Sequence, residues 1–221
     1  MNAKFSISEE NYIKSIYHLQ QQNDLVNTNT LAAELRSKAA SVTDMLKKLH
    51  QKKLVQYQPY KGFKLNEKGS KIALGIVRRH RLWEYFLAEK LGMDWDKVHM
   101  IAEDLEHVSS DELVQRLDDF LGNPKFDPHG DPIPDSSGKM EILNQVRLCD
   151  LPAKKIAVVC SVSNQSSQML EMLKHYNIGI GSKLKLIKHF DFDGSIEIRR
   201  NQQEPCIISK EVAKNIFVHY E

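Results

Sequence analysis

The amino-acid sequence predicts a mainly α-helical protein with some β structure, arranged in three parts. Residues up to 66 alternate short amphipathic helical segments with one pair of strand-like segments. Residues 67–121 show the three- and four-residue spacing of apolar side chains that is typical of helices. Beyond about residue 148, short alternating segments are separated by glycines. We therefore expect domains at residues 1–66, 67–140 and 148–221.

In the first part, residues 6–9 (Ser-Ile-Ser-Glu) have the capping-box spacing that begins a helix. A short helix is expected over residues 28–36, and a third helix carries Val42, Leu46 and Leu49 on one face. Two strand-like segments on either side of residues 59–62 predict a β-hairpin. Helix, short helix, turn, helix and hairpin is the order of a winged helix-turn-helix.

Charge is unevenly distributed along the chain. Residues 1–81 hold 15 Lys and Arg against 6 Asp and Glu, a net charge of +9, whereas residues 82–221 hold 16 against 23, a net charge of −7. A basic winged helix favours DNA binding, with the third helix in the major groove and lysines on phosphates. The predicted DNA-binding residues are Lys38, Ala40, Ser41, Thr43, Asp44, Lys47, Lys61 and Lys64. Chance clustering of surface charge and a winged helix that contacts protein are the alternatives.

In the second part we expect helices over residues 67–91, 94–108 and 110–121, followed by an irregular, linker-like segment over 123–138 that contains several prolines. In the third part the expected strands are residues 156–159, 183–187, 195–198 and 206–208, with one helix over 166–175. A small β-barrel is the natural interpretation of this last pattern.

Composition excludes several classes of protein. No apolar run approaches the roughly 20 residues that span a bilayer, and residues 1–5 lack the apolar core of a signal peptide. Cys149, Cys160 and Cys206 are odd in number and widely spaced, which is typical of reduced thiols in a cytoplasmic protein. No catalytic motif is present, and we expect a protein that is not an enzyme.

Histidines and carboxylates gather on the predicted helices of the second part. His99, Glu103, Glu106 and His107 fall on one helix face, separate from the apolar stripe, and His80 and Glu84 are four residues apart on another helix. Carboxylates on adjacent turns repel unless a positive charge lies between them. Imidazole and carboxylate ligands without thiolate suit Mn²⁺, Fe²⁺, Co²⁺ or Zn²⁺.

Two alternatives to a metal site of this kind stay open. One is a solvated polar helix face. The other is a carboxylate-type metalloenzyme, which would need a Glu-x-x-His pair repeated on two helices.

The chain resembles the diphtheria toxin repressor and manganese transport regulator family of metal-dependent repressors. The matching stretches are residues 10–17, 39–49, 60–65, 80–84, 102–107 and 127–134. Residues 148–221 are similar, more loosely, to the SH3-like, FeoA-type domain of larger members. The resemblance implies a cytoplasmic homodimer that binds a palindromic DNA operator when metal is present, and that represses metal-uptake genes.

The resemblance also implies ligands for two metal sites. The first set is Asn11, Glu103, Glu106 and His107, and the second is His80, Glu84 and His99, extended by His129 and Asp127. Glu103 stands where iron-responsive members often carry Cys, which favours Mn²⁺ over Fe²⁺. Asn11 departs from the family, whose members usually have Asp or Met there, and the neighbouring Glu10 is an alternative ligand. A regulator that responds to an organic ligand or to a protein is the remaining alternative.

Overall fold

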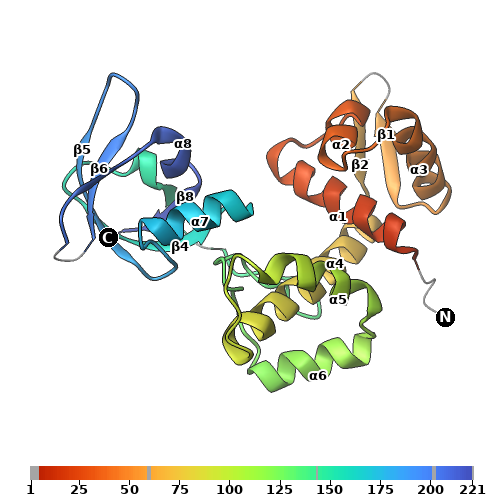
Figure 1. Ribbon diagram of the computed structural model, residues 1–221. Coiled ribbons are helices and arrows are strands. Elements are labelled where there is room, and N and C mark those ends of the chain that lie inside the picture. The colour runs from red at the N-terminus through yellow and green to blue at the C-terminus, as the bar shows by residue number, and fades with distance from the viewer. Residues whose placement is uncertain (1–4, 59–60, 143, 201–202, 221) are drawn as a thin grey trace. The chain divides into compact units, whose positions relative to one another are not determined.

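The structure is a computed structural model that describes residues 5–58, 61–142, 144–200 and 203–220. The chain divides into two compact units, the first formed by Met1–His80, Asp104–Val114 and Pro134–Lys139, and the second by Arg81–Glu103, Gln115–Ile133 and Met140–Glu221. Helices dominate the first half of the chain and an antiparallel sheet the last third, which confirms the predicted fold class (Figure 1).

The first unit begins with three helices and a hairpin. Helix α1 (Ile7–Gln22) starts at a capping box, in which Ser6 and Glu9 bond each other's backbone nitrogens. Helices α2 (Thr28–Glu34) and α3 (Ala39–Gln51) follow, and β1 (Val55–Gln58) pairs with β2 (Gly62–Leu65) in antiparallel register. The predicted winged helix-turn-helix is confirmed, although Pro59 and Tyr60 of its expected turn lie outside the described residues.

A continuous apolar core holds these elements together. Its fully buried side chains include Ile13, Ile16, Leu31, Val42, Leu46, Leu49, Leu54 and Phe63. Each side chain of this size stabilises the fold by about 1.5–3 kcal/mol when it leaves water. Because α3 buries only one stripe, its opposite face stays exposed.

The second predicted helical region differs from expectation at two places. Helix α4 (Glu67–Tyr85) does not run on to residue 91 as a regular helix, because a π-helical turn, η1 (Phe86–Lys90), follows it with a bond from the Leu91 nitrogen to the Phe86 carbonyl (3.2 Å). Helix α5 (Val98–Val108) starts four residues later than expected. The Trp95 carbonyl accepts a hydrogen bond from His129 Nε2 (2.9 Å), a contact that an earlier helix start would have replaced by an intrahelical bond.

Helix α6 (Asp111–Leu121) ends where predicted, at Gly122 and Asn123, both of which have positive φ. Within the described part of the chain, no helix combines the length and the apolar character that crossing a bilayer requires.

The segment after α6 is irregular, as predicted, but it is fixed in place by specific contacts. Asp127 Oδ1 accepts hydrogen bonds from the backbone nitrogens of His129 (2.8 Å) and Asp131 (3.0 Å). Gly130 has φ +85°, and a Cβ there would lie 1.8 Å from the Cys160 carbonyl oxygen. Only glycine allows this approach, which brings the loop against the sheet.

The last third of the chain forms one antiparallel sheet in the order β3-β8-β4-β5-β6-β7. Its strands are β3 (Val146–Arg147), β4 (Ile156–Val162), β5 (Lys183–His189), β6 (Ile196–Arg200), β7 (Cys206–Ile208) and β8 (Ile216–His219), with the 3₁₀ turn η2 (Leu148–Asp150) and helices α7 (Ser167–His175) and α8 (Lys210–Ala213). The sequence analysis missed β3, α8 and β8, which are two to four residues long and too short to show periodicity.

Candidate metal centre

Glu106 on α5 is the centre of a cluster in the first unit. Its side chain is fully buried, and its two oxygens contact Lys14 Nζ (Oε1, 2.6 Å) and His80 Nδ1 (Oε2, 2.6 Å). Burial alone would raise the pKa of Glu106, but the hydrogen bonds and charges of His80 and then of Lys14 hold the pKa below its usual value. Glu106 is therefore an ionised carboxylate.

His107, the next residue, presents a nitrogen that can accept a metal ion. Its Nδ1 lies 2.6 Å from Glu10 Oε2, and Glu10 Oε1 in turn accepts a hydrogen bond from Arg79 (2.7 Å). With the Nδ1 proton donated to a carboxylate, the lone pair is on Nε2. That Nε2 is buried, has no hydrogen-bond partner among the described residues, and lies 3.5 Å from Glu106 Oε1.

Asn11 adds a second acceptor from α1. Its Oδ1 is buried and receives no hydrogen bond from any residue that the structure describes. Asn11 follows Glu10 and precedes Lys14 by one helical turn, so α1 presents it beside the residues that contact Glu106 and His107. A neutral oxygen and an imidazole nitrogen, both without donors, beside an ionised carboxylate fit a divalent cation of borderline hardness.

The contacts of Glu10 and Glu106 bear on two of the sequence-based expectations. Glu10, the alternative ligand, contacts the His107 ring through its carboxylate. Of the two carboxylates on adjacent turns of α5 that were expected to repel each other, Glu106 has its charge compensated by Lys14. The half-buried Glu103 lies one turn before Glu106 on α5 and belongs to the second compact unit, so its place in this ligand set rests on helical spacing.

A second cluster lies in the second unit and joins Glu84, Asp127 and His129. One ligand atom from each lies within 4.8 Å of the others, and all three residues are buried. His129 Nε2 donates to the Trp95 carbonyl (2.9 Å), which leaves Nδ1 facing Glu84 Oε2 at 3.6 Å. Glu84 Oε1 contacts His99 Nδ1 (3.0 Å). On α4, His80 precedes Glu84 by one turn.

The electrostatics of this second cluster indicate a surplus of negative charge. Burial, followed by the charges of Asp131 and Glu84, raises the pKa of Asp127 to about 7. Burial lowers the pKa of His129, but the hydrogen bond and charge of Glu84 outweigh it and raise the pKa above its usual value. Arg81 supplies a permanent positive charge, with its Nε 3.5 Å from Asp127 Oδ2. Added positive charge would stabilise this cluster.

The predicted DNA-binding residues occupy the exposed face of α3 and the hairpin. Lys38, Ala40, Ser41, Thr43, Asp44, Lys47 and Lys61 are exposed. Two lysines have local partners: Lys47 contacts Asp44 (3.2 Å), and the half-buried Lys64 contacts Asp24 (3.1 Å). Both lysines stay predicted phosphate contacts, since ion pairs with such exposed carboxylates are weak.

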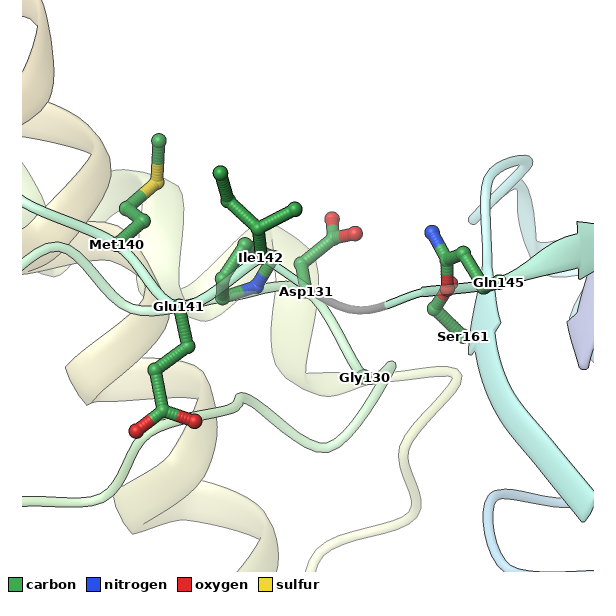
Figure 2. A pocket seen from close by; sticks show the side chains of 8 residues that line it. Gly130, Asp131, Met140, Glu141, Ile142, Gln145 and Ser161 are labelled. Atoms are coloured by element: carbon green, nitrogen blue, oxygen red, sulfur yellow. The ribbon is translucent and has the colours of Figure 1, made fainter. Parts of the chain in front are cut away.

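A pocket outside both clusters was not foreseen. Its walls are Gly130, Asp131, Pro132, Met140, Glu141, Ile142, Gln145 and Ser161. Figure 2 shows Gln145 and Ser161 side by side at one end, where Ser161 Oγ donates to Gln145 Oε1 (2.9 Å). Asp131 at its edge accepts hydrogen bonds from Arg81 (3.2 Å) and Gln165 (3.0 Å). The side chains of Asp131, Gln145 and Ser161 thus already have hydrogen-bond partners.

Sequence reasoning also missed the roles of Arg79, Arg81 and Trp95. Each contacts a candidate ligand or its neighbour from a distant part of the chain. For these three residues the sequence offers no signal of this kind. For α1 it does, because the spacing of Glu10 and Lys14 places an acid and a base on the same helix face, next to Asn11.

Comparison with known protein families gives three matches along the chain. Residues 4–63 match the iron dependent repressor N-terminal DNA binding domain, residues 66–135 the iron dependent repressor metal binding and dimerisation domain, and residues 146–220 the FeoA domain.

Individual relatives agree with these matches. The iron-dependent repressor IdeR of Mycobacterium tuberculosis is 32% identical over 161 residues, covering 68% of this chain and 69% of that protein. The diphtheria toxin repressor of Corynebacterium glutamicum is 28% identical over 205 residues, covering 87% of each.

Solved structures give the same answer. A manganese-dependent transcriptional repressor in complex with manganese has a TM-score of 0.88 at 32% identity and covers 96% of this chain and 100% of its own. The manganese regulator SloR has a TM-score of 0.79 at 31% identity, covering 96% and 98%. The chain therefore belongs to the iron-dependent repressor family, whose members are metal-dependent, DNA-binding transcriptional repressors and not enzymes.

Proposed function

We propose that this repressor responds to Mn²⁺, or to Fe²⁺ in its place, through two ligand sets. The first is Asn11, Glu103, Glu106 and His107, with Glu10 orienting His107, and the second is His80, Glu84, His99, Asp127 and His129. The observation that carries the proposal is the buried His107 Nε2, which has no hydrogen-bond partner in the described chain and faces an ionised Glu106 at 3.5 Å.

The ligand atoms support a choice of metal. Both sets contain carboxylate oxygens and imidazole nitrogens, the first set adds the amide oxygen of Asn11, and neither contains a thiolate, the donor that favours softer ions. The manganese-dependent repressor that the chain resembles was solved with manganese, which points the same way. A bound divalent cation would cancel the charge of these carboxylates and tie ligands on different helices to one point.

The chain's own residues would couple this site to DNA. Asn11 lies on α1, which packs in the core of the winged helix-turn-helix, whereas Glu106 and His107 lie on α5. Fixing α1 against α5 would select one orientation of α3, and a coupling of about 1–3 kcal/mol is enough for a switch. Ser41 and Thr43 would then meet base edges, and Lys38, Lys47 and Lys61 phosphates.

We further propose a homodimer joined through α5 and α6, matching the dimerisation domain of the family. These helices expose Met100 (75%), Val108 (76%) and Phe120 (68%), large apolar side chains that a partner copy would cover. Two copies of α3 would then read the halves of a palindromic operator about 34 Å apart, or a multiple of that spacing. The proposed location is the cytoplasm, and the proposed targets are metal-uptake genes.

The proposal is tested by titrating operator DNA binding with Mn²⁺, Fe²⁺ and Zn²⁺, each with a chelator control. His107→Ala should abolish the metal-stimulated binding while leaving the fold intact, whereas His175→Ala, at an exposed position on α7, should behave as the wild type. A wild-type metal response in His107→Ala, or DNA binding of the wild type that chelator leaves unchanged, would contradict the proposal.

A further inference from the structure

The carboxylate of Glu106, a proposed metal ligand, already forms an ion pair with a lysine side chain of the same protein. Lys14 Nζ lies 2.6 Å from Glu106 Oε1, and the two side chains are 12% and 0% exposed. The same oxygen is the one that faces His107 Nε2 at 3.5 Å, while the other oxygen is held by His80. The ammonium therefore sits on the oxygen that a metal bound to His107 would need.

An ammonium and a divalent cation cannot share this oxygen without strong repulsion. A metal–carboxylate oxygen distance is about 2.0–2.2 Å, so a metal ion and Lys14 Nζ on the same oxygen would be less than about 5 Å apart. Charges this close in a buried site interact far more strongly than they do in water. Lys14 has a flexible stem and a small exposed fraction, so its ammonium can move into solvent when the oxygen is taken.

We infer that Lys14 is a tethered competitor of the metal ion, occupying Glu106 in the metal-free protein and leaving it when metal binds. The inference rests on the proposed first ligand set. The ion pair between Lys14 and Glu106 then has two effects. It stabilises the metal-free state by compensating a buried carboxylate, and it weakens metal binding, because the ion pair must be broken before the metal ion can bind. Lys14 thus sets the metal concentration at which the repressor responds.

The test compares Lys14→Gln, which keeps a hydrogen-bond donor but removes the charge, with Lys14→Arg, which keeps the charge. Mn²⁺ binding to the full-length protein is measured by calorimetry, and thermal unfolding is measured with and without saturating Mn²⁺. Lys14→Gln should bind Mn²⁺ about tenfold more tightly than the wild type, and Lys14→Arg about as tightly as the wild type, since only the glutamine variant lacks the competing charge.

Unfolding separates competition from a merely structural role. Metal-free Lys14→Gln should melt at a lower temperature than the wild type, and saturating Mn²⁺ should remove that difference. An Mn²⁺ affinity of Lys14→Gln that is unchanged or weaker, or a melting difference that persists with metal, overturns the inference. Failure of the proposed ligand set would look different: the wild type and His107→Ala would then bind Mn²⁺ equally.

Discussion

Replacing Glu10 tests whether this residue positions a metal ligand or is one. Glu10 holds His107 Nδ1 at 2.6 Å and is itself held by Arg79 at 2.7 Å, in a partly buried setting. Carboxylates that orient a ligand histidine typically contribute about 10–100-fold to metal affinity. That factor corresponds to about 1.4–2.7 kcal/mol.

The two available substitutions divide this effect. Glu10→Gln keeps an oxygen that accepts the Nδ1 proton but loses the charge that makes Nε2 more basic, so we expect a loss near the lower end, about tenfold. Glu10→Ala removes both and leaves the Nδ1 donor and Arg79 without their partner, so we expect a loss of about 100-fold in affinity. The same variant should lower the free energy of unfolding by about 1–3 kcal/mol.

Mn²⁺ calorimetry in a His129→Ala background, which disables the second ligand set, measures this site alone. Loss of Mn²⁺ binding in Glu10→Gln as complete as in His107→Ala would mean that Glu10 is itself a ligand. Unchanged affinity in Glu10→Ala would refute the argument that the Nδ1 contact prepares Nε2 for metal.

Three further predictions follow from the same structure. Asn11→Asp should tighten Mn²⁺ binding by about tenfold or more, because it converts a proposed neutral ligand into a charged one. It should also lower the metal-free melting temperature, because it places a negative charge at a buried position; weaker Mn²⁺ binding would show that Asn11 does not face the ion. The raised pKa of Asp127, about 7 against 3.8, means that the folded state holds the proton of this carboxyl more tightly than the unfolded state does. The contribution of Asp127 to metal-free stability is therefore complete below about pH 4 and is lost as the pH rises through 7. The difference in melting temperature between pH 5 and pH 8 should be smaller in Asp127→Asn than in the wild type, and equal differences would contradict the shift. Gly130→Ala should destabilise the protein, because its Cβ would meet the Cys160 carbonyl at 1.8 Å in a backbone conformation with positive φ; thermal unfolding measures this, and a melting temperature equal to that of the wild type would contradict it.

Much of the fold was predictable because its signals are local. The capping box at Ser6, the apolar stripe of α3 and the glycine after α6 each depend on neighbours within one or two turns. The π-helical turn after α4 and the delayed start of α5 were not predictable. The delayed start of α5 depends on a hydrogen bond between Trp95 and His129, which are 34 residues apart.

The candidate site was likewise predictable only in the part that depends on local spacing. Helical spacing was sufficient to put Glu106 and His107 on one face of α5. Two of the partners of these residues, Lys14 and Glu10, come from α1, more than 90 residues earlier in the chain, and no spacing rule reaches that far. Lys14 in particular could be seen as a charge near the site, whereas its contact with the buried Glu106 oxygen depends on tertiary packing.

His129 is held both through its backbone and through its imidazole ring. Its backbone carbonyl accepts a hydrogen bond from the Val162 nitrogen of β4 (3.1 Å), while its imidazole faces Glu84 and is fixed by the Trp95 carbonyl. A displacement of β4 would be transmitted through one residue to the nitrogen that faces Glu84. The FeoA-type sheet therefore anchors the backbone of His129, a member of the proposed second ligand set, and removing the sheet would remove this anchor as well as a folded domain.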